Sequence, residues 1–256
     1  WPELRVLRHE TDGLGDIIMT DELPFHRILL KVSGEALMGD QGFGIDRAVI
    51  DRISEEIAAV TSLGVKMAIV VGGGNIFRGA DVRIADDNRV AGHHMGMLAT
   101  VMNCIALHDG LREAGLEPRI MSAIAMPEIC DSFSQREARK AFDDGEVLLF
   151  AAGTGAPYFT TDTGAALRAL ELECDALFKG TNVDGIYSAD PKKDQNAIRY
   201  ASMSHDDVLA RGLQVMDVAA VDLARQGHIP IVVFSIQSPG ALYEVANGSG
   251  RCTIVS

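Results

Sequence analysis

Short apolar segments alternate with amphipathic segments along most of this chain, and glycine-rich turns follow several of the apolar ones. Runs rich in aliphatic and β-branched residues predict strands at 27–33, 65–71, 119–123, 146–151, 176–180, 230–234 and 252–255. Apolar residues at helical spacing predict helices at 46–64, 88–114, 134–143, 163–173, 204–211 and 216–226. This alternation predicts an α/β fold, a three-layer sandwich in which helices cover both faces of a mainly parallel sheet.

Length and composition fit one such domain. The chain has 256 residues, of which 47% are hydrophobic and only 5% aromatic, so aliphatic and alanine packing must build the core. Residues 1–26 are acidic over much of their length and lack a sustained period, which predicts a loosely held N-terminal extension. Residues 27–256 form the expected domain, with a first lobe over about 27–152 and a second, which has its own glycine turns, over about 153–256.

The charge and the cysteines limit the kinds of partner and compartment. A formal net charge of −13 argues against a general nucleic-acid or anionic-membrane surface. No apolar run reaches the ~18 residues of a membrane helix, and the start of the chain lacks the pattern of a secretory signal. The four cysteines have long, irregular spacings, which is typical of reduced thiols. We therefore expect a cytoplasmic protein that binds anions through local cations and backbone N–H groups.

The first two glycine-rich turns favour phosphate binding. Lys31 ends a predicted strand and Gly34 opens the turn after it, where a lysine could neutralise a transferring phosphoryl group. The next strand ends in residues 72–74, three glycines whose unobstructed N–H groups could hold an anion, and Arg78 follows with its planar fork. Neither segment is a P-loop or a dinucleotide-binding G-x-G-x-x-G. Taken singly, a surface lysine and a tight strand-to-helix turn also explain them.

Two further turns lie in the second half. Residues 153–162 combine glycines and threonines with Asp162 ahead of a predicted helix, which favours an anion site at the helix N-terminus, although capping alone explains part of the pattern. Residues 179–191 begin with a strand-end lysine, and Tyr187 could stack on a base while Asp190 could bind ribose. A solvated turn is the alternative there. All four turns fall at the carboxyl ends of strands, where open α/β sheets bind ligands.

Together these segments resemble the amino acid kinase superfamily, and within it the bacterial uridylate kinases, which phosphorylate UMP to UDP. The resemblance covers nearly all of 27–255 and is most specific at 31–37, 72–79, 95–103, 153–162, 183–185 and 215–217. It implies the amino acid kinase-like fold, with an acceptor-side first lobe and an ATP-side second lobe. It also implies transfer of the γ-phosphoryl group of ATP to UMP in pyrimidine nucleotide (CTP/UTP) biosynthesis, with Mg²⁺ accompanying ATP. A homohexamer, activation by GTP and inhibition by UTP are further implications.

The resemblance also implies roles for individual residues. The implied catalytic residues are Lys31, Arg78, Asp162, Lys179 and Asp217, the last orienting the two lysines. The implied ATP-binding residues are Lys31, Val32, Ser33, Gly34, Gly74, Arg78, Thr181, Tyr187 and Asp190. The implied UMP-binding residues are Gly73, His93, Thr154, Gly155, Ala156, Pro157, Tyr158, Phe159, Thr160 and Thr161. The implied GTP-activation loop is Gly39, Asp40, Gln41, Gly42, Phe43 and Gly44. No protein residue is expected to be a metal ligand.

Three positions depart from the family pattern, and two alternatives stay open. His93 stands where the family usually has Asp at the UMP ribose, and Ala156 where it usually has Asn, so the departures concern acceptor affinity. Asn182 replaces a more usual lysine beside the ATP site. One alternative is a superfamily kinase acting on a carboxylate or carbamate, which the loop at 153–162 disfavours. The other is a non-catalytic nucleotide-binding or storage protein on the same fold.

Overall fold

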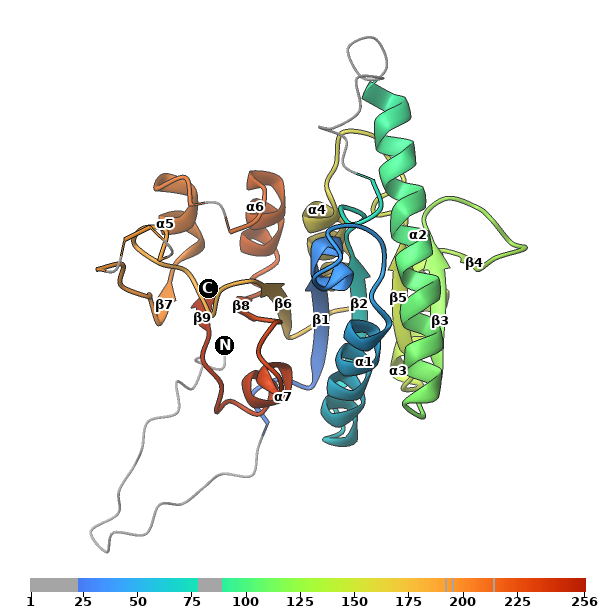
Figure 1. Cartoon of the computed structure of the whole chain (residues 1–256), viewed down its shortest axis with the longest axis horizontal. Helices are drawn as coiled ribbons and strands as arrows, with labels where there is room; N and C mark the ends of the chain where they lie inside the picture. Colours follow the sequence, from blue (N-terminus) through green and yellow to red (C-terminus); the bar gives the residue numbers. More distant parts are fainter. Residues whose placement is uncertain (1–22, 78–88, 192, 195, 214) are drawn as a thin grey trace, which may run out of the picture.

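One sheet runs through both halves of the chain (Figure 1). The computed structural model describes residues 23–77, 89–191, 193–194, 196–213 and 215–256, so most of the predicted N-terminal extension lies outside the described residues. Within them the sheet has nine strands in the order β4-β3-β5-β2-β1-β6-β8-β9-β7. The strands are β1 (Arg27–Val32), β2 (Lys66–Val71), β3 (Pro118–Ser122), β4 (Asp131–Ser132), β5 (Val147–Ala151), β6 (Ala176–Thr181), β7 (Ser202–Met203), β8 (Ile231–Ser235) and β9 (Thr253–Val255). Every neighbouring pair is parallel except β8 and β9, which confirms the predicted, mainly parallel sheet.

Helices cover both faces of the sheet, so the predicted three-layer arrangement is also confirmed (Figure 1). The helices are the 3-10 helix η1 (Gly34–Met38) and the α-helices α1 (Arg47–Ser62), α2 (Arg89–Glu113), α3 (Gln135–Asp143), α4 (Thr161–Glu171), α5 (His205–Ala210), α6 (Val218–Gln226) and α7 (Ala241–Ala246). Side chains of α1, α2 and α7 join the hydrophobic core on one face. Side chains of α3, α4, α5 and α6 join the core on the other.

The alternation along β1 decides where its lysine points. Ile28, Leu30 and Val32 belong to the core under α1 and α2, whereas Leu29 belongs to the core under α4. Because successive strand residues face opposite sides of a sheet, Lys31 lies on the α4 side with Leu29. The strand is buried on both faces, which explains why it reads as an apolar run with one lysine at its end.

Capping residues set the helix starts. The side chain of Asp46 caps α1 by accepting from Ala48 N at 2.9 Å. Helix α4 begins two residues before the predicted start because Thr160 caps it, and α6 begins two residues after its predicted start because Asp217 caps it. The sequence prediction missed four short elements, which are η1, α7, β4 and β7.

Helix α2 is apolar enough and long enough to meet the composition test for a membrane span, with a mean hydropathy of 1.3 over its best window. The sequence prediction had found no such segment. One face of α2 packs into the core through Val101, Cys104 and Leu107. The helix also carries the buried polar residues Thr100 and Asn103, so we interpret it as a core helix of the sandwich.

Candidate active site

Two lysines lie side by side at the carboxyl ends of neighbouring strands. Lys31 of β1 is in register with Lys179 of β6. Leu177, two residues before Lys179, belongs to the core under α4, so Lys179 lies on the same side of the sheet as Lys31. The two residues are only 6% and 9% exposed. Two ammonium groups that are neighbours and are shielded from water need a negatively charged group between them.

Asp162, in the first turn of α4, supplies that anion. Its Oδ1 lies 2.6 Å from Nζ of Lys31. Nζ of Lys179 donates to both carboxylate oxygens of Asp162, at 2.8 and 2.7 Å. The structure therefore brings together three of the predicted catalytic residues in one buried, charge-assisted network.

The network shifts the ionisation of its members. Burial alone would raise the pKa of Asp162, but the charges of Lys31 and Lys179 outweigh it and hold that pKa below its usual value. Burial, together with the charge of Lys31, lowers the pKa of Lys179 to about 8, although Asp162 opposes this lowering. Asp162 thus helps to keep Lys179 charged near neutral pH.

Asp217 holds the start of α4 and makes its contacts away from the lysines. Its Oδ1 and Oδ2 accept from Thr163 Oγ1 at 2.9 and 3.0 Å, and Oδ2 also accepts from the Thr160 hydroxyl. It caps its own helix by accepting from Ala220 N at 3.0 Å. Asp162 contacts the lysines directly, whereas Asp217 contacts the start of the helix that carries Asp162, so any orienting effect of Asp217 on the lysines acts through that helix.

The glycine turns after β1 and β2 touch one another beside this network. A Cβ added to Gly34 would lie 2.4 Å from the carbonyl oxygen of Gly72, so only glycine permits this approach. Gly72 N donates to Val32 O at 2.9 Å. Thr161 also lies beside Gly72, since a Cβ added to Gly72 would stand 3.5 Å from the Thr161 hydroxyl oxygen. Gly34, Gly72 and Thr161 thus meet at the ends of β1, β2 and the start of α4.

The remaining glycines of the second turn have different neighbours. An added Cβ on Gly73 would lie 2.8 Å from Ala99 Cβ and from Gly96 O, so Gly73 packs directly on α2. Gly74 lies beside the side chain of Glu35 on η1. Arg78, predicted to bind phosphate, lies outside the described residues.

The predicted UMP loop, residues 154–161, and the two residues before it include several in an unusual backbone conformation. Ala152 and Tyr158 have φ of 62° and 72°, and Gly153 and Gly155 lie in the same left-handed region. Ala152 N donates to Thr100 Oγ1 at 2.8 Å, which ties the loop to α2. Such strained residues persist where the surrounding structure fixes them, often at functional sites.

The structure brings His93 to this loop. Its ring centroid lies 5.0 Å from that of Tyr158, at an interplanar angle of 55°. Inside the loop, Ala156 N donates to Thr154 Oγ1 at 3.2 Å. The side chains of Tyr158 and Phe159 are 67% and 52% exposed, and Pro157 precedes them. The predicted UMP residues from α2 and from the loop therefore share one region.

The predicted adenosine residues follow β6. Thr181 ends the strand, and its hydroxyl donates to Val183 O at 2.7 Å. Tyr187 donates to Asp184 at 2.6 Å, and this hydrogen bond raises the pKa of Tyr187. Asp190 is exposed and lies 3.6 Å from Lys193. Ser33, another of the predicted ATP-binding residues, lies between the end of β1 and the start of η1.

The predicted effector loop, residues 39–44, is attached to the second glycine turn. Gly44 N donates to Asn75 O at 2.8 Å, and Asn75 Nδ2 donates to Gly44 O at the same distance. Phe43, near the loop tip, is 65% exposed. The loop thus presents an aromatic side chain to solvent while its end is bound to the site.

Sequence reasoning assigned no role to four polar residues that support the turns, namely Thr100, Asn103, Thr163 and Asn75. The first two are polar residues on the buried face of the apolar helix α2. That position was the available signal, because buried polar side chains are retained where they make hydrogen bonds. Thr163 follows Thr160, Thr161 and Asp162, which are all residues that favour helix caps, so the sequence does not distinguish it from them.

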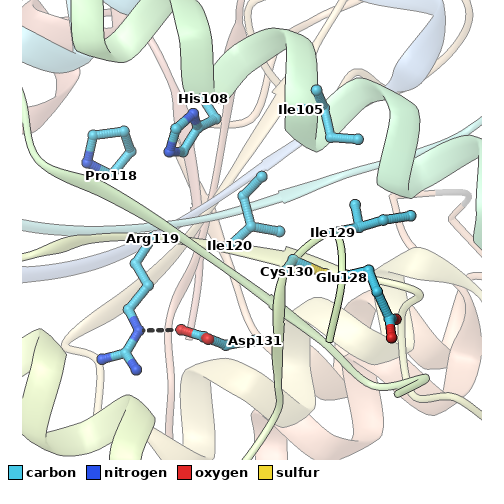
Figure 2. A pocket seen from close by; sticks show the side chains of 9 residues that line it. All are labelled: Ile105, His108, Pro118, Arg119, Ile120, Glu128, Ile129, Cys130 and Asp131. Atoms are coloured by element: carbon cyan, nitrogen blue, oxygen red, sulfur yellow. Dashed lines mark hydrogen bonds and ion pairs between the residues drawn. The ribbon is translucent and has the colours of Figure 1, made fainter. Parts of the chain in front are cut away.

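A surface pocket of about 500 Å³ lies between α2, β3 and the segment before β4 (Figure 2). Its lining residues are Ile105, His108, Pro118, Arg119, Ile120, Glu128, Ile129, Cys130 and Asp131. Arg119 donates to Asp131 at 2.6 Å across its lower edge (Figure 2). It contains none of the predicted substrate or effector residues, so the lysine network rather than this pocket defines the candidate active site.

Comparisons with known proteins match this arrangement. The chain is 60% identical over 238 residues to the uridylate kinase of Brucella anthropi, covering 93% of this chain and 99% of that one. It is 57% identical to the uridylate kinase of Agrobacterium fabrum over the same shares. The UMP kinase structure from Bacillus anthracis superimposes with a TM-score of 0.87 at 32% identity, covering 91% of this chain and 96% of that one. The UMP kinase structure from Ureaplasma parvum gives 0.86 at 37% identity, with coverages of 90% and 98%.

The profile of the amino acid kinase family matches residues 26–235. This stretch contains the lysine network, all four of the turns described above and the predicted effector loop. The chain therefore belongs to the amino acid kinase family.

Proposed function

We propose that this protein transfers the γ-phosphoryl group of ATP to UMP, giving UDP and ADP, as a nucleoside monophosphate kinase of pyrimidine nucleotide biosynthesis. The observation that carries the proposal is the pair of buried lysines joined by Asp162 where Gly34, Gly72 and Thr161 meet. Uridylate kinases at 57–60% identity over nearly their whole length support the choice of UMP.

Charge neutralisation is the central task of such a site. The acceptor is already an anion, so the reaction needs no general base, but two polyanions must approach each other. Two unit charges ~4 Å apart repel by about 1 kcal/mol in water and by about 4 kcal/mol near a protein surface. Lys31 and Lys179 can offset this repulsion and stabilise the in-line transition state, because they lie at the strand ends where both phosphate chains must meet.

Asp162 and the glycine turns prepare the site before substrate binds. Asp162 holds both ammonium groups in place, so little reorganisation is needed when phosphate oxygens arrive. The N–H groups of the Gly72–Gly74 turn and the start of α4 add neutral donors. Asp217 contributes indirectly by fixing α4 through Thr163.

We propose that ATP and UMP bind on opposite sides of the lysine pair, each against its own group of residues. ATP would bind along residues 31–34, Gly74 and Arg78, with its nucleoside near Thr181, Tyr187 and Asp190. UMP would bind against Gly73, His93 and residues 154–161. The support for this division is that residues after β6 gather on one side of the lysine pair, whereas the loop after β5 contacts α2 on the other.

Mg²⁺ fits this site as a companion of ATP. Among the residues that the structure describes, no three His, Cys, Asp or Glu side chains gather into a metal site. Mg²⁺ commonly keeps waters and binds substrate phosphates with one or two carboxylates, and Asp162 is the carboxylate of the lysine network. When bound, the ion would neutralise charge on the phosphates.

We further propose a cytoplasmic homohexamer, activated by GTP at residues 39–44 and inhibited by UTP. An exposed apolar stripe on α2 supports self-association. Met95, Leu98, Met102 and Ile105 are 40–53% exposed and recur at helical spacing. A second copy of the chain could cover this stripe, because symmetric oligomers use self-complementary faces. The attachment of Gly44 to Asn75 supports an effector role for the loop.

A coupled assay of ADP release with ATP and Mg²⁺ tests the function. The acceptor panel is UMP, CMP, dCMP, carbamate and amino acids. We expect UMP to give the highest kcat/KM. Preference for carbamate or a carboxylate would favour another kinase of the family, and binding of nucleotide without turnover would favour a storage protein.

A further inference from the structure

Two buried amide side chains lie where the glycine turns meet, and they belong to none of the sets assigned above. Asn75 follows the Gly72–Gly74 turn and is 2% exposed, and Asn103 lies on α2 and is fully buried. Asn103 stands between Val101 and Cys104, which belong to the hydrophobic core. Amides in such surroundings are costly unless their N–H and C=O groups are all paired.

The two amides bond to each other and to two backbone carbonyls. Asn75 Nδ2 donates to Asn103 Oδ1 at 2.9 Å, and Asn103 Nδ2 donates to Asn75 Oδ1 at 2.7 Å. The second N–H of Asn103 reaches Gly72 O at 2.7 Å, and that of Asn75 reaches Gly44 O at 2.8 Å. Reversing either amide would place its oxygen against a carbonyl oxygen, so the network has one satisfied arrangement.

Three chain segments converge on this pair. The Gly72 turn is held because its carbonyl oxygen accepts from the Asn103 amide. Gly44 is held twice, because its N–H also donates to Asn75 O at 2.8 Å. The turn at Gly34 packs on both, since an added Cβ there would lie 2.6 Å from Asn75 Oδ1 and 2.4 Å from Gly72 O. The pair therefore connects the end of the Lys31 strand, the second glycine turn and the loop at residues 39–44.

We propose that the Asn75–Asn103 pair is a positioning element that fixes the Gly72 turn against the Gly34 turn for phosphoryl transfer and couples the loop at residues 39–44 to that geometry. The inference rests on the proposed function, which puts the transferring phosphates at these turns. Neither amide touches the reacting atoms. A movement of the loop reaches the phosphate turn through Asn75, which contacts both.

Helix α2 offers a built-in comparison, because it holds the acceptor loop through a different residue. Thr100 lies one turn before Asn103 and accepts from Ala152 N at 2.8 Å. Losing the Asn103 contacts should disturb the phosphate turn, whereas losing the Thr100 contact should disturb the acceptor loop. The two perturbations therefore predict different kinetic signatures from neighbouring sites on one helix.

The test compares Asn103→Leu with Thr100→Val and with Leu107→Ala, a buried core truncation one turn further along α2. ATP and UMP kinetics are measured well below each variant's Tm. We expect Asn103→Leu to lower kcat ten- to hundredfold with KM for UMP within threefold of the native value, because small misplacements of reacting groups have effects of this size. Thr100→Val should mainly raise KM for UMP, and Leu107→Ala should keep kcat within twofold. If Asn103→Leu does not fold, Asn103→Ser is measured in its place. We expect it too to lower kcat while KM for UMP stays near the native value.

Hydrogen exchange measures the coupling independently of activity. Asn103 does not bond to the loop, so faster exchange of the Gly44 amide in the Asn103 variant, but not in Leu107→Ala, supports transmission through Asn75. Native kcat in the Asn103 variant, an equal loss of kcat in Leu107→Ala, or unchanged Gly44 exchange overturns the proposal. If the native protein fails to phosphorylate UMP, the proposed function fails instead, and the exchange result alone decides whether the amides couple the loop to the turn.

Discussion

Replacing Asp162 by asparagine leaves Lys31 and Lys179 facing each other without a counter-ion. In the native protein the carboxylate lies 2.6 Å from Nζ of Lys31 and 2.7 Å from Nζ of Lys179. Removing one partner of a buried ion pair costs about 3–5 kcal/mol, because the remaining charge stays buried and uncompensated. For a chain of this size that corresponds to a fall in Tm of roughly 6–20 °C.

The same replacement changes the pH dependence of turnover. Burial and the charge of Lys31 lower the pKa of Lys179 to about 8, and Asp162 works against that lowering. Without the carboxylate, the pKa of Lys179 falls further, so the lysine loses its proton at a lower pH. Since a neutral amine cannot offset phosphate charge, the alkaline limb of kcat should move to lower pH. At pH 7.5 we expect kcat to fall about 10²–10³-fold, the loss typical of one missing charge-stabilising donor.

Initial rates of ADP release from pH 6 to 9.5 and urea unfolding at pH 7.5 measure both effects. Asp143→Asn is the matched control, because Asp143 pairs with Arg27 at the surface and its side chain is 56% exposed. That variant should leave the urea midpoint close to the native one and keep the native pH profile, because exposed ion pairs contribute little to stability. An Asp162→Asn profile that superimposes on the native one, with kcat within threefold, refutes the reasoning that Asp162 keeps the lysines charged.

Three further predictions test other parts of the site and the surface. Lys31→Ala should lower kcat at least about 100-fold while KM for UMP changes less than about threefold, and near-native steady-state turnover would exclude a catalytic role. Gly34→Ala should lower kcat at least about tenfold, because its Cβ would lie 2.4 Å from Gly72 O. Gly92→Ala is the control, since a Cβ there meets open space. Equal activity of the two variants would contradict the close approach of the two turns. Leu98→Glu combined with Met102→Glu should shift the protein to a smaller species in light scattering, because each places a charge in the apolar stripe of α2; an unchanged mass contradicts that interface.

The larger elements of the fold could be predicted because their burial leaves a clear pattern. Central strands such as β1 and β2 are covered on both faces and read as apolar runs. The elements that were missed are short. Strands β4 and β7 have two residues each and depend on pairing with distant β3 and β9, which local sequence does not encode. Helix α7 has six residues after Gly240, too few for a helical period to emerge.

The site could be predicted as a set of residues but not as a set of contacts. Strand-end lysines at 31 and 179 stood out, yet their adjacency follows from the pairing of β1 with β6, which lie far apart in the sequence. Asp162 and Asp217 both lie at helix starts, so sequence alone offers no means of deciding which one contacts the lysines. The packing of α4 beside α6 decides it, by placing Asp217 against Thr163 and leaving Asp162 free to face the strand ends.

Two of the three departures from the family pattern, His93 and Ala156, lie at the predicted acceptor loop and on the helix beside it. Buried ion pairs and paired amides hold the lysine network and the two glycine turns, and a change there disturbs several partners at once. The acceptor loop instead depends on left-handed residues and on an exposed ring, since Tyr158 is 67% exposed and rests against His93. An imidazole at position 93, where the resemblance leads us to expect a carboxylate, therefore changes one group at this loop and none of the contacts that hold the lysine network. We therefore expect His93 and Ala156 to affect how tightly UMP binds, and the lysine network to govern how fast the phosphoryl group is transferred.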